Sequence, residues 1–68
     1  MKYEVIIYWS EEDQVFIAEV PELPGCAADG GSKTDALANV ERVAQEWIET
    51  AKSLNHEVPA PKGRLLFA

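Results

Sequence analysis

The fold of this chain is decided by residues 20–32, which read Val-Pro-Glu-Leu-Pro-Gly-Cys-Ala-Ala-Asp-Gly-Gly-Ser. Pro21 and Pro24 fix the backbone angle φ at two positions and Gly25 adds a permissive residue, so this stretch ends one strand and reverses the chain. The run Cys26–Ala28 that follows predicts a short strand. Its small side chains allow another element to pack closely against it.

A helix is expected directly after this stretch. Ser32 is a preferred N-cap residue, and Asp35 stands three positions later, as in a capping box. Asn55 is suited to the left-handed conformation that ends a helix, and the proline-rich segment after it cannot continue one. Between these ends, apolar residues recur at spacings of three and four, which predicts one face packed on a sheet: Leu37, Val40, Ala44, Trp47, Ile48, Ala51 and Leu54.

Two further strands are expected before the deciding stretch and one after the helix. Lys2–Trp9 predicts a strand with large apolar residues on both faces, with Tyr3, Val5, Ile7 and Trp9 on one face and Glu4, Ile6 and Tyr8 on the other. Val15–Val20 is rich in β-formers, and the acidic turn Ser10–Gln14 joins the two strands into a hairpin. Arg64–Phe67 predicts a final strand. The predicted order is therefore β-β-β-α-β, an α+β fold with an antiparallel-rich sheet and one helix packed on it, in a single domain spanning residues 1–68.

Length and charge restrict the functions that this chain can have. A chain of 68 residues with one cysteine has a small core and no disulfide, so we expect a homo-oligomer, a dimer or larger, that buries more apolar surface. The net charge of −6 argues against direct nucleic acid binding, which needs clustered Lys and Arg. No apolar run approaches the roughly 18 residues of a membrane span, and the N-terminus does not resemble a signal peptide. We therefore expect a cytoplasmic protein.

No residue pattern predicts catalysis. Glu11, Glu12 and Asp13 are adjacent in a turn, which spreads their side chains into solvent rather than around one metal ion. Cys26 has no neighbouring histidine to activate it, and a buried small residue is expected there. His56 stands at the predicted end of the helix, where it can stabilise the last carbonyl groups. We therefore assign no catalytic residue, no metal and no cofactor, and expect a binding protein that is not an enzyme.

The deciding stretch, extended to Ala36, resembles the HicB antitoxin family. Members of that family have a strand, a Pro-x-Leu-Pro-Gly-Cys segment, a short strand, a turn and a helix in this order, and here Pro21-Glu22-Leu23-Pro24-Gly25-Cys26 matches that segment. The resemblance extends to the tyrosine-containing first strand, the acidic hairpin turn, Trp47-Ile48 and the exit at residues 58–61. Three positions differ mildly from the residues common in the family: Gly31, Ser32 and Asp35 stand where Asp, Thr and Glu are usual.

The resemblance implies a partly degraded ribonuclease-H-like fold without catalytic carboxylates. It implies that the protein neutralises HicA, a small basic messenger-RNA ribonuclease with a catalytic histidine. Typical members continue into a DNA-binding domain, and this chain stops after its predicted last strand. The resemblance therefore does not extend to promoter binding, and we expect a natural short form of the family.

The hypothesis with most support is a binding module that occludes a basic HicA-like toxin. Trp9 is the expected anchor, since Trp and Tyr are enriched at interfaces and Trp9 and Tyr8 stand on opposite faces of the first strand. The expected steering residues are the acidic side chains of Glu11, Glu12, Asp13, Glu22 and Asp29. Two alternatives stay open: an orphan HicB-like domain acting as a generic protein- or ligand-binding unit, and a residual nuclease that would need converging carboxylates and a divalent metal.

Overall fold

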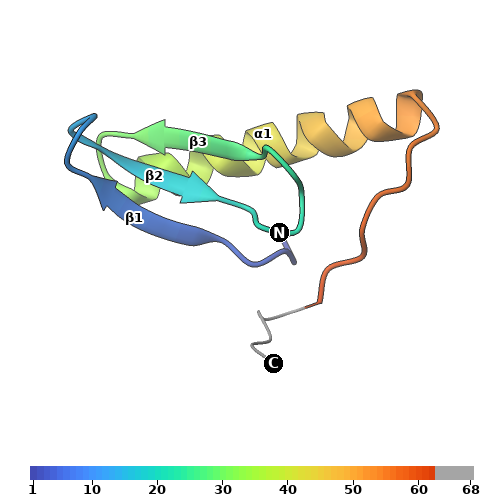
Figure 1. Cartoon of the computed structure of the whole chain (residues 1–68), viewed down its shortest axis with the longest axis horizontal. Coiled ribbons are helices and arrows are strands. Elements are labelled where there is room, and N and C mark those ends of the chain that lie inside the picture. Colours follow the sequence, from blue (N-terminus) through green and yellow to red (C-terminus); the bar gives the residue numbers. More distant parts are fainter. Residues whose placement is uncertain (63–68) are drawn as a thin grey trace.

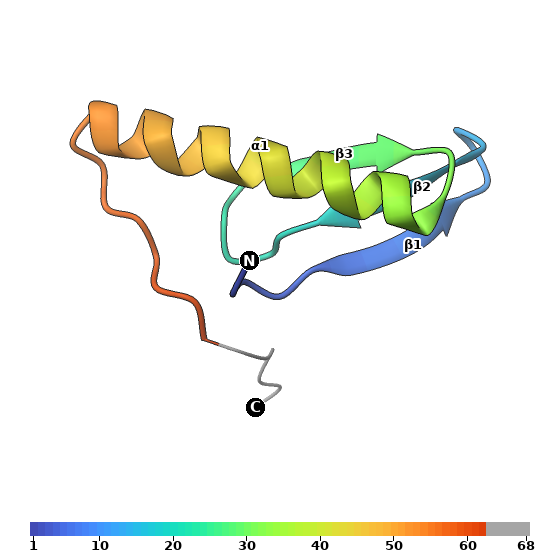
Figure 2. The same cartoon turned by 180° about the vertical axis from the view of Figure 1, so that it is seen from behind.

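The computed structural model describes residues 1–62 and shows a three-stranded sheet with one helix against one of its faces (Figure 1). The strands are β1 (Ile6–Ser10), β2 (Val15–Glu19) and β3 (Ala27–Gly30), and the helix α1 spans Lys33–Ser53. The strands pair antiparallel in the order β1-β2-β3. Seen from behind, α1 lies in front of the sheet (Figure 2). The predicted α+β class and β-β-β-α order are confirmed, and the strand predicted at residues 64–67 lies outside the described residues.

The strand register separates the sheet into a covered face and an open one. Ile7 pairs with Ala18 and Ala18 with Ala28; Ala18 belongs to the core cluster, and Ile7 and Ala28 pack against it. Tyr8 pairs with Ile17, and these two side chains point to the other side because successive residues of a strand alternate. The predicted alternation is therefore confirmed, although the first strand begins at Ile6 and not at Lys2.

The third strand begins at Ala27 and not at the predicted Cys26, and it extends two residues further than predicted, to Gly30. Asp29 and Gly30, predicted as part of a turn, pair instead with Ile17 and Phe16 of β2. This pairing brings Gly30 directly beneath the start of α1, where a Cβ atom would lie only 2.5 Å from the backbone nitrogen of Ala36. Glycine is therefore required for the close approach of strand and helix, which the sequence alone does not reveal.

Small side chains form most of the core between the sheet and α1. Cys26 is only 3% exposed, as expected of a small apolar residue, and Ala36 is fully buried although it lies outside the predicted apolar stripe. Leu54 is 59% exposed, so its predicted place on the buried stripe is wrong: α1 ends one residue earlier, and Leu54 is its C-cap. The fully or nearly fully buried residues of this core are Ala18, Val20, Leu23, Cys26, Ala36, Val40 and Ala44.

Both ends of α1 are fixed by the residues that the sequence indicates. The Ser32 side chain accepts a hydrogen bond from the Asp35 backbone nitrogen at 3.1 Å, which confirms the N-cap. Asn55 adopts a left-handed φ of 59°, and the backbone nitrogen of His56 then donates to the Ala51 carbonyl at 2.8 Å. Within residues 1–62 no helix has the length and apolar character needed to cross a membrane.

Two side-chain hydrogen bonds join the connecting segments to the helix and to the start of the chain. The Trp47 indole nitrogen donates a hydrogen bond to the Pro24 carbonyl at 2.9 Å, which joins α1 to the turn after β2. The Tyr3 hydroxyl donates to the carbonyl of Pro59. This contact holds the segment after α1 against the chain entering β1.

Candidate protein-binding surface

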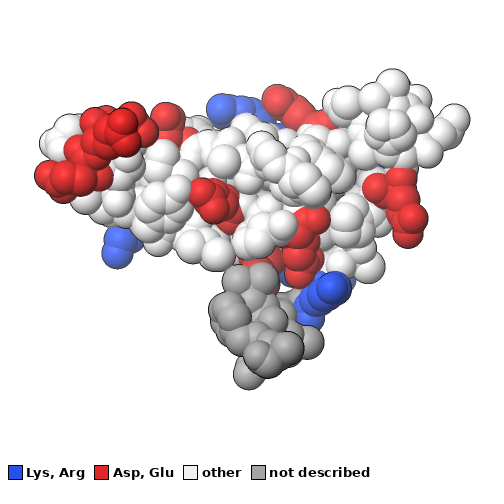
Figure 3. All heavy atoms as spheres, in the orientation of Figure 1, with Lys and Arg blue, Asp and Glu red and all other residues white. Residues whose placement is uncertain are grey.

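The turn between β1 and β2 forms an ordered acidic projection, here called the hairpin tip (Trp9, Glu11, Glu12 and Asp13). The backbone nitrogen of Gln14 donates to the Ser10 carbonyl at 2.8 Å, and the Gln14 side chain donates to the Glu11 carbonyl at 2.7 Å. The three carboxylates are exposed. They form the group of acidic atoms at the left end of Figure 3.

Trp9 is half of an aromatic pair at the base of this tip. Its ring meets Phe16 edge-on with 5.0 Å between the ring centroids, and its indole nitrogen donates to a Glu11 carboxylate oxygen at 2.7 Å. Trp9 is 44% exposed and lies on the covered side of the sheet with Phe16, beyond the main core. Its ring is therefore both oriented by neighbours and accessible to a partner.

The other two residues expected to bind a partner lie away from the tip. Asp29 is exposed on β3 and points to the open side, because it pairs with Ile17. Glu22 follows β2 at the opposite end of the sheet, where its carboxylate accepts a hydrogen bond from the backbone nitrogen of Lys62 at 3.3 Å. The six expected residues are thus divided among three places, with four of them together at the hairpin tip.

The open sheet face is a second surface, which the sequence reasoning did not assign. We define it by Ile6, Tyr8, Val15, Ile17, Glu19, Ala27 and Asp29, whose pairing places them opposite α1. Ile6 is 40% and Tyr8 44% exposed, large fractions for apolar side chains. The only charged residues within the three strands are Glu19 and Asp29, both on this face. In Figure 3, which views this side, uncharged surface is interrupted by acidic groups.

Tyr8 and Glu19 form a hydrogen-bonded pair at the centre of this face. The Tyr8 hydroxyl donates to the Oε2 atom of Glu19 at 2.7 Å. This hydrogen bond, with smaller effects of desolvation and of the charges on Glu19 and Asp13, raises the pKa of Tyr8. The alternating pattern of β1 indicates that Tyr8 and Ile6 share a face, but the contact with Glu19 depends on the hairpin register, which the turn sequence does not fix.

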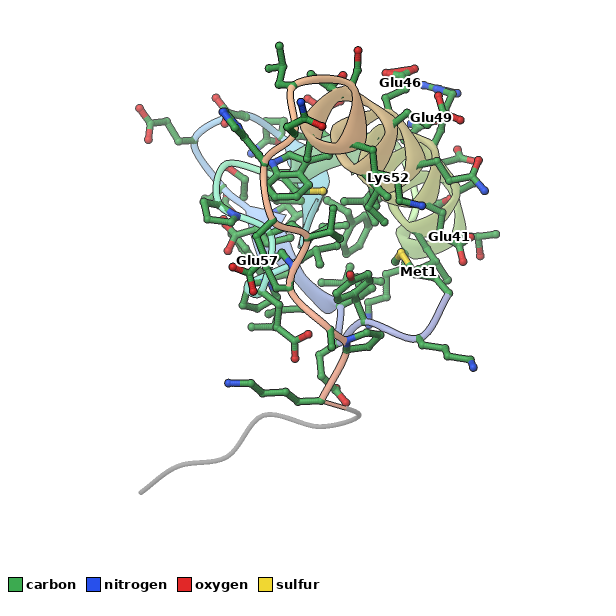
Figure 4. The ribbon with its side chains drawn as sticks, turned by 90° about the vertical axis from the view of Figure 1, so that its right-hand side faces the viewer. Met1, Glu41, Glu46, Glu49, Lys52 and Glu57 are labelled. Carbon is green, nitrogen blue, oxygen red and sulfur yellow. The ribbon has the colours of Figure 1, made fainter. Side chains whose placement is uncertain are left out.

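The helix side of the molecule has other surface features. A shallow apolar groove along the second half of α1 is lined by Val43, Trp47, Ala51 and Leu54. Figure 4, viewed along α1 from its C-terminal end, shows Glu46 and Glu49 pointing outward from the helix, and Glu57 on the segment that follows. These carboxylates are therefore well separated from the hairpin tip.

The described residues do not assemble a metal centre. Within residues 1–62, no group of three or more His, Cys, Asp or Glu side chains could hold a metal ion. Burial raises the pKa of the Cys26 thiol, which disfavours the reactive thiolate. The arrangement of this part of the chain is suited to contact with another macromolecule through acidic and apolar surfaces.

Comparison with known proteins gives matches over most of the chain. Residues 3–64 match the family described as HicB-like antitoxin of bacterial toxin-antitoxin system. The UPF0150 protein Ta0767 of Thermoplasma acidophilum is 41% identical over 59 residues, which cover 87% of this chain and 84% of that protein. The UPF0150 protein ssl0259 of Synechocystis sp. is 37% identical over 60 residues, covering 88% of this chain and 81% of that protein. No solved structure matches the chain.

Proposed function

Because this chain belongs to the HicB-like antitoxins of bacterial toxin-antitoxin systems, we propose that it neutralises a small basic HicA-type ribonuclease by covering the toxin's surface. The observation that carries this proposal is the family membership. It is joined by the finding that every charged side chain of the three strands and of the hairpin tip is acidic. The activity requires no chemistry from this chain. It requires a stable complex formed in the cytoplasm, where messenger RNA is cleaved.

Electrostatic complementarity supports a basic partner. The chain has 12 acidic against 6 basic residues, and three of the carboxylates are exposed together at the hairpin tip. A ribonuclease must present positive charge to hold the phosphates of its substrate. An acidic protein is attracted to the same positive surface and competes with RNA for it. Binding of the antitoxin is therefore enough to inhibit the toxin.

Self-association is a further part of this proposal. Among the described residues β1 is an outer strand of the sheet, and it contains three exposed large side chains, Ile6, Tyr8 and Trp9. It has no Pro and no charged side chain, both of which natural proteins use to protect such edges. At the other edge of the sheet, Asn39 of α1 donates a hydrogen bond to the Asp29 carbonyl at 2.7 Å and so occupies a backbone group of β3. A second copy is therefore expected to pair along β1.

Light scattering of the purified chain tests the self-association. We expect the mass of a dimer or larger assembly for the wild type and for Leu54→Lys, and a monomer for Trp9→Lys. A monomeric wild type at high concentration would contradict this part of the proposal while leaving toxin binding intact.

Co-expression tests the antitoxin function itself. The small basic protein encoded beside this chain is expressed alone and together with it, and growth and RNA cleavage are measured. We expect growth to recover, cleavage to stop and the two proteins to copurify. Toxicity that persists in the presence of the folded chain, with no complex, would contradict the proposal.

A matched pair of charge-reversal variants tests the role of the hairpin tip. Glu11→Lys/Glu12→Lys/Asp13→Lys and Glu46→Lys/Glu49→Lys/Glu57→Lys both change the net charge from −6 to 0. We expect neutralisation to be lost in the first variant and kept in the second. Equal loss in both would mean that only the overall charge of the antitoxin matters.

A further inference from the structure

The open sheet face has the composition of an interface but no partner within the described chain. Its centre is apolar, since the pairs Ile6–Glu19 and Tyr8–Ile17 place two isoleucines and a tyrosine side by side. None of these belongs to the core cluster or packs against it. A face with exposed Ile6 and Tyr8 therefore leaves apolar area in contact with water, which a partner could cover.

The charges on this face select the kind of partner. The strands carry Glu19 and Asp29 on this side and no Lys or Arg. Two copies stacked through this face would bring four carboxylates together without a strand cation to pair with them. Arg42 of α1 lines a shallow hollow at the outer edge of β3 together with Ile17 and Asp29. A positively charged partner meets no such repulsion.

We infer that the open sheet face is the docking surface for the toxin, and that the Tyr8–Glu19 pair receives an arginine or lysine side chain of the toxin. This inference rests on the proposed function and specifies where the toxin binds. It moves the centre of the contact from Trp9 to the opposite side of β1. The hairpin tip then guides the approach of the toxin from the end of the sheet.

The geometry of the pair explains how it would receive a cation. The Tyr8 hydroxyl occupies Oε2 of Glu19 and thereby holds the carboxylate in one orientation before the partner arrives. Among the described residues, Oε1 of Glu19 has no donor, so it can accept a charge-assisted hydrogen bond from Arg or Lys. The exposed Tyr8 ring lies beside it and can pack against a guanidinium plane or an alkyl stem. Ile6 and Ile17 surround the pair and would exclude water.

Binding measurements with two matched variants test this inference. Glu19→Gln and Glu46→Gln each remove one negative charge, so both change the net charge of the chain by the same amount. Glu46 lies on α1, pointing away from the sheet (Figure 4). The Kd is measured by calorimetry for the full chain and the small basic protein encoded beside it, with the catalytic histidine of that toxin replaced by alanine.

We expect Glu19→Gln to raise the Kd at least tenfold and Glu46→Gln to change it less than twofold. Tyr8→Ala should raise the Kd by a similar factor, whereas Leu54→Ala, which removes an exposed side chain from the other side of the molecule, should not. Tyr8→Phe keeps the ring and removes only the hydroxyl, so its Kd should lie between those of the wild type and Tyr8→Ala. Circular dichroism checks that each variant is folded.

The outcomes distinguish this inference from the function on which it rests. Tight binding by the wild type with equal Kd values for Glu19→Gln and Glu46→Gln would overturn the docking surface and leave the antitoxin function standing. No binding by the wild type would overturn both. If Tyr8→Ala lowers the mass of the chain in the absence of toxin while Trp9→Lys does not, the contact between copies is the open sheet face and the inference is wrong.

Discussion

Replacing Gly30 with alanine would place a methyl group inside the first turn of α1. Its Cβ atom would lie 2.5 Å from the Ala36 backbone nitrogen, 2.7 Å from the Asp35 carbonyl carbon and 2.8 Å from the Asp35 Cβ. These are mainly backbone atoms, so no side-chain rotation relieves the contact. Restoring a separation of at least 3.4 Å requires the start of α1 to move away from β3 by about 0.9 Å.

The expected cost of Gly30→Ala follows from this displacement. Overpacking of a close-packed interior typically costs about 1–3 kcal/mol, and we expect roughly 3 kcal/mol here because backbone must move. A chain of this length has a total unfolding free energy of about 3–10 kcal/mol, so the substitution would remove a large part of it. At about 4–8 °C per kcal/mol for a domain of this size, the melting temperature should fall by roughly 12–24 °C.

Urea unfolding followed by tryptophan fluorescence measures this effect. Gly31→Ala is the matched control, because a Cβ at Gly31 has no atom within 4 Å and its backbone does not adopt a positive φ. We expect Gly31→Ala to leave the unfolding free energy unchanged or raise it by up to about 1 kcal/mol. Unfolding free energies within about 0.5 kcal/mol of one another for the two variants would refute the proposed packing of β3 against α1.

Three further measurements test other features of the structure. Ser32→Ala should lower the unfolding free energy by about 1 kcal/mol, since it removes the acceptor for the Asp35 backbone nitrogen, and Ser32→Asp should restore most of it. Spectroscopic titration should give Tyr8 a pKa above the usual 10.0, and this pKa should fall in Glu19→Gln. Because folding raises the pKa of Tyr8, the hydrogen bond from its hydroxyl to Glu19 contributes fully to stability below pH 10. This contribution is lost as the pH rises through the folded-state pKa. The Cys26 thiol, buried and with a raised pKa, should react slowly with thiol reagents until urea unfolds the chain; fast labelling of the native protein would contradict its burial.

Part of the candidate surface could be predicted from sequence because it depends on neighbouring residues. Adjacent carboxylates at positions 11–13 fall in a turn, so their exposure follows from the hairpin alone. The Tyr8–Glu19 pair needed the register of β1 and β2, which brings together residues 11 positions apart. Glu22 was expected to act with the other acidic residues, but the direction of the chain after β2 places it at the opposite end of the sheet. Whether any of these residues contacts a toxin is still a prediction.

Elements that depend on neighbouring residues could be predicted from the amino-acid order alone. Ser32 begins α1 and Asn55 follows its end because capping and left-handed backbone preferences act over a few residues, and alternation in β1 determined which side chains share a face. Other features depend on contacts between segments that are distant in the sequence, and these were seen only in the folded chain. Pairing with β2 extended β3 to Gly30, the packing of α1 on one face left Ile6 and Tyr8 exposed on the other, and the end of α1 at Ser53 left Leu54 in solvent. A local pattern specifies that a strand has two faces, but only the position of the helix specifies which one is open to a partner.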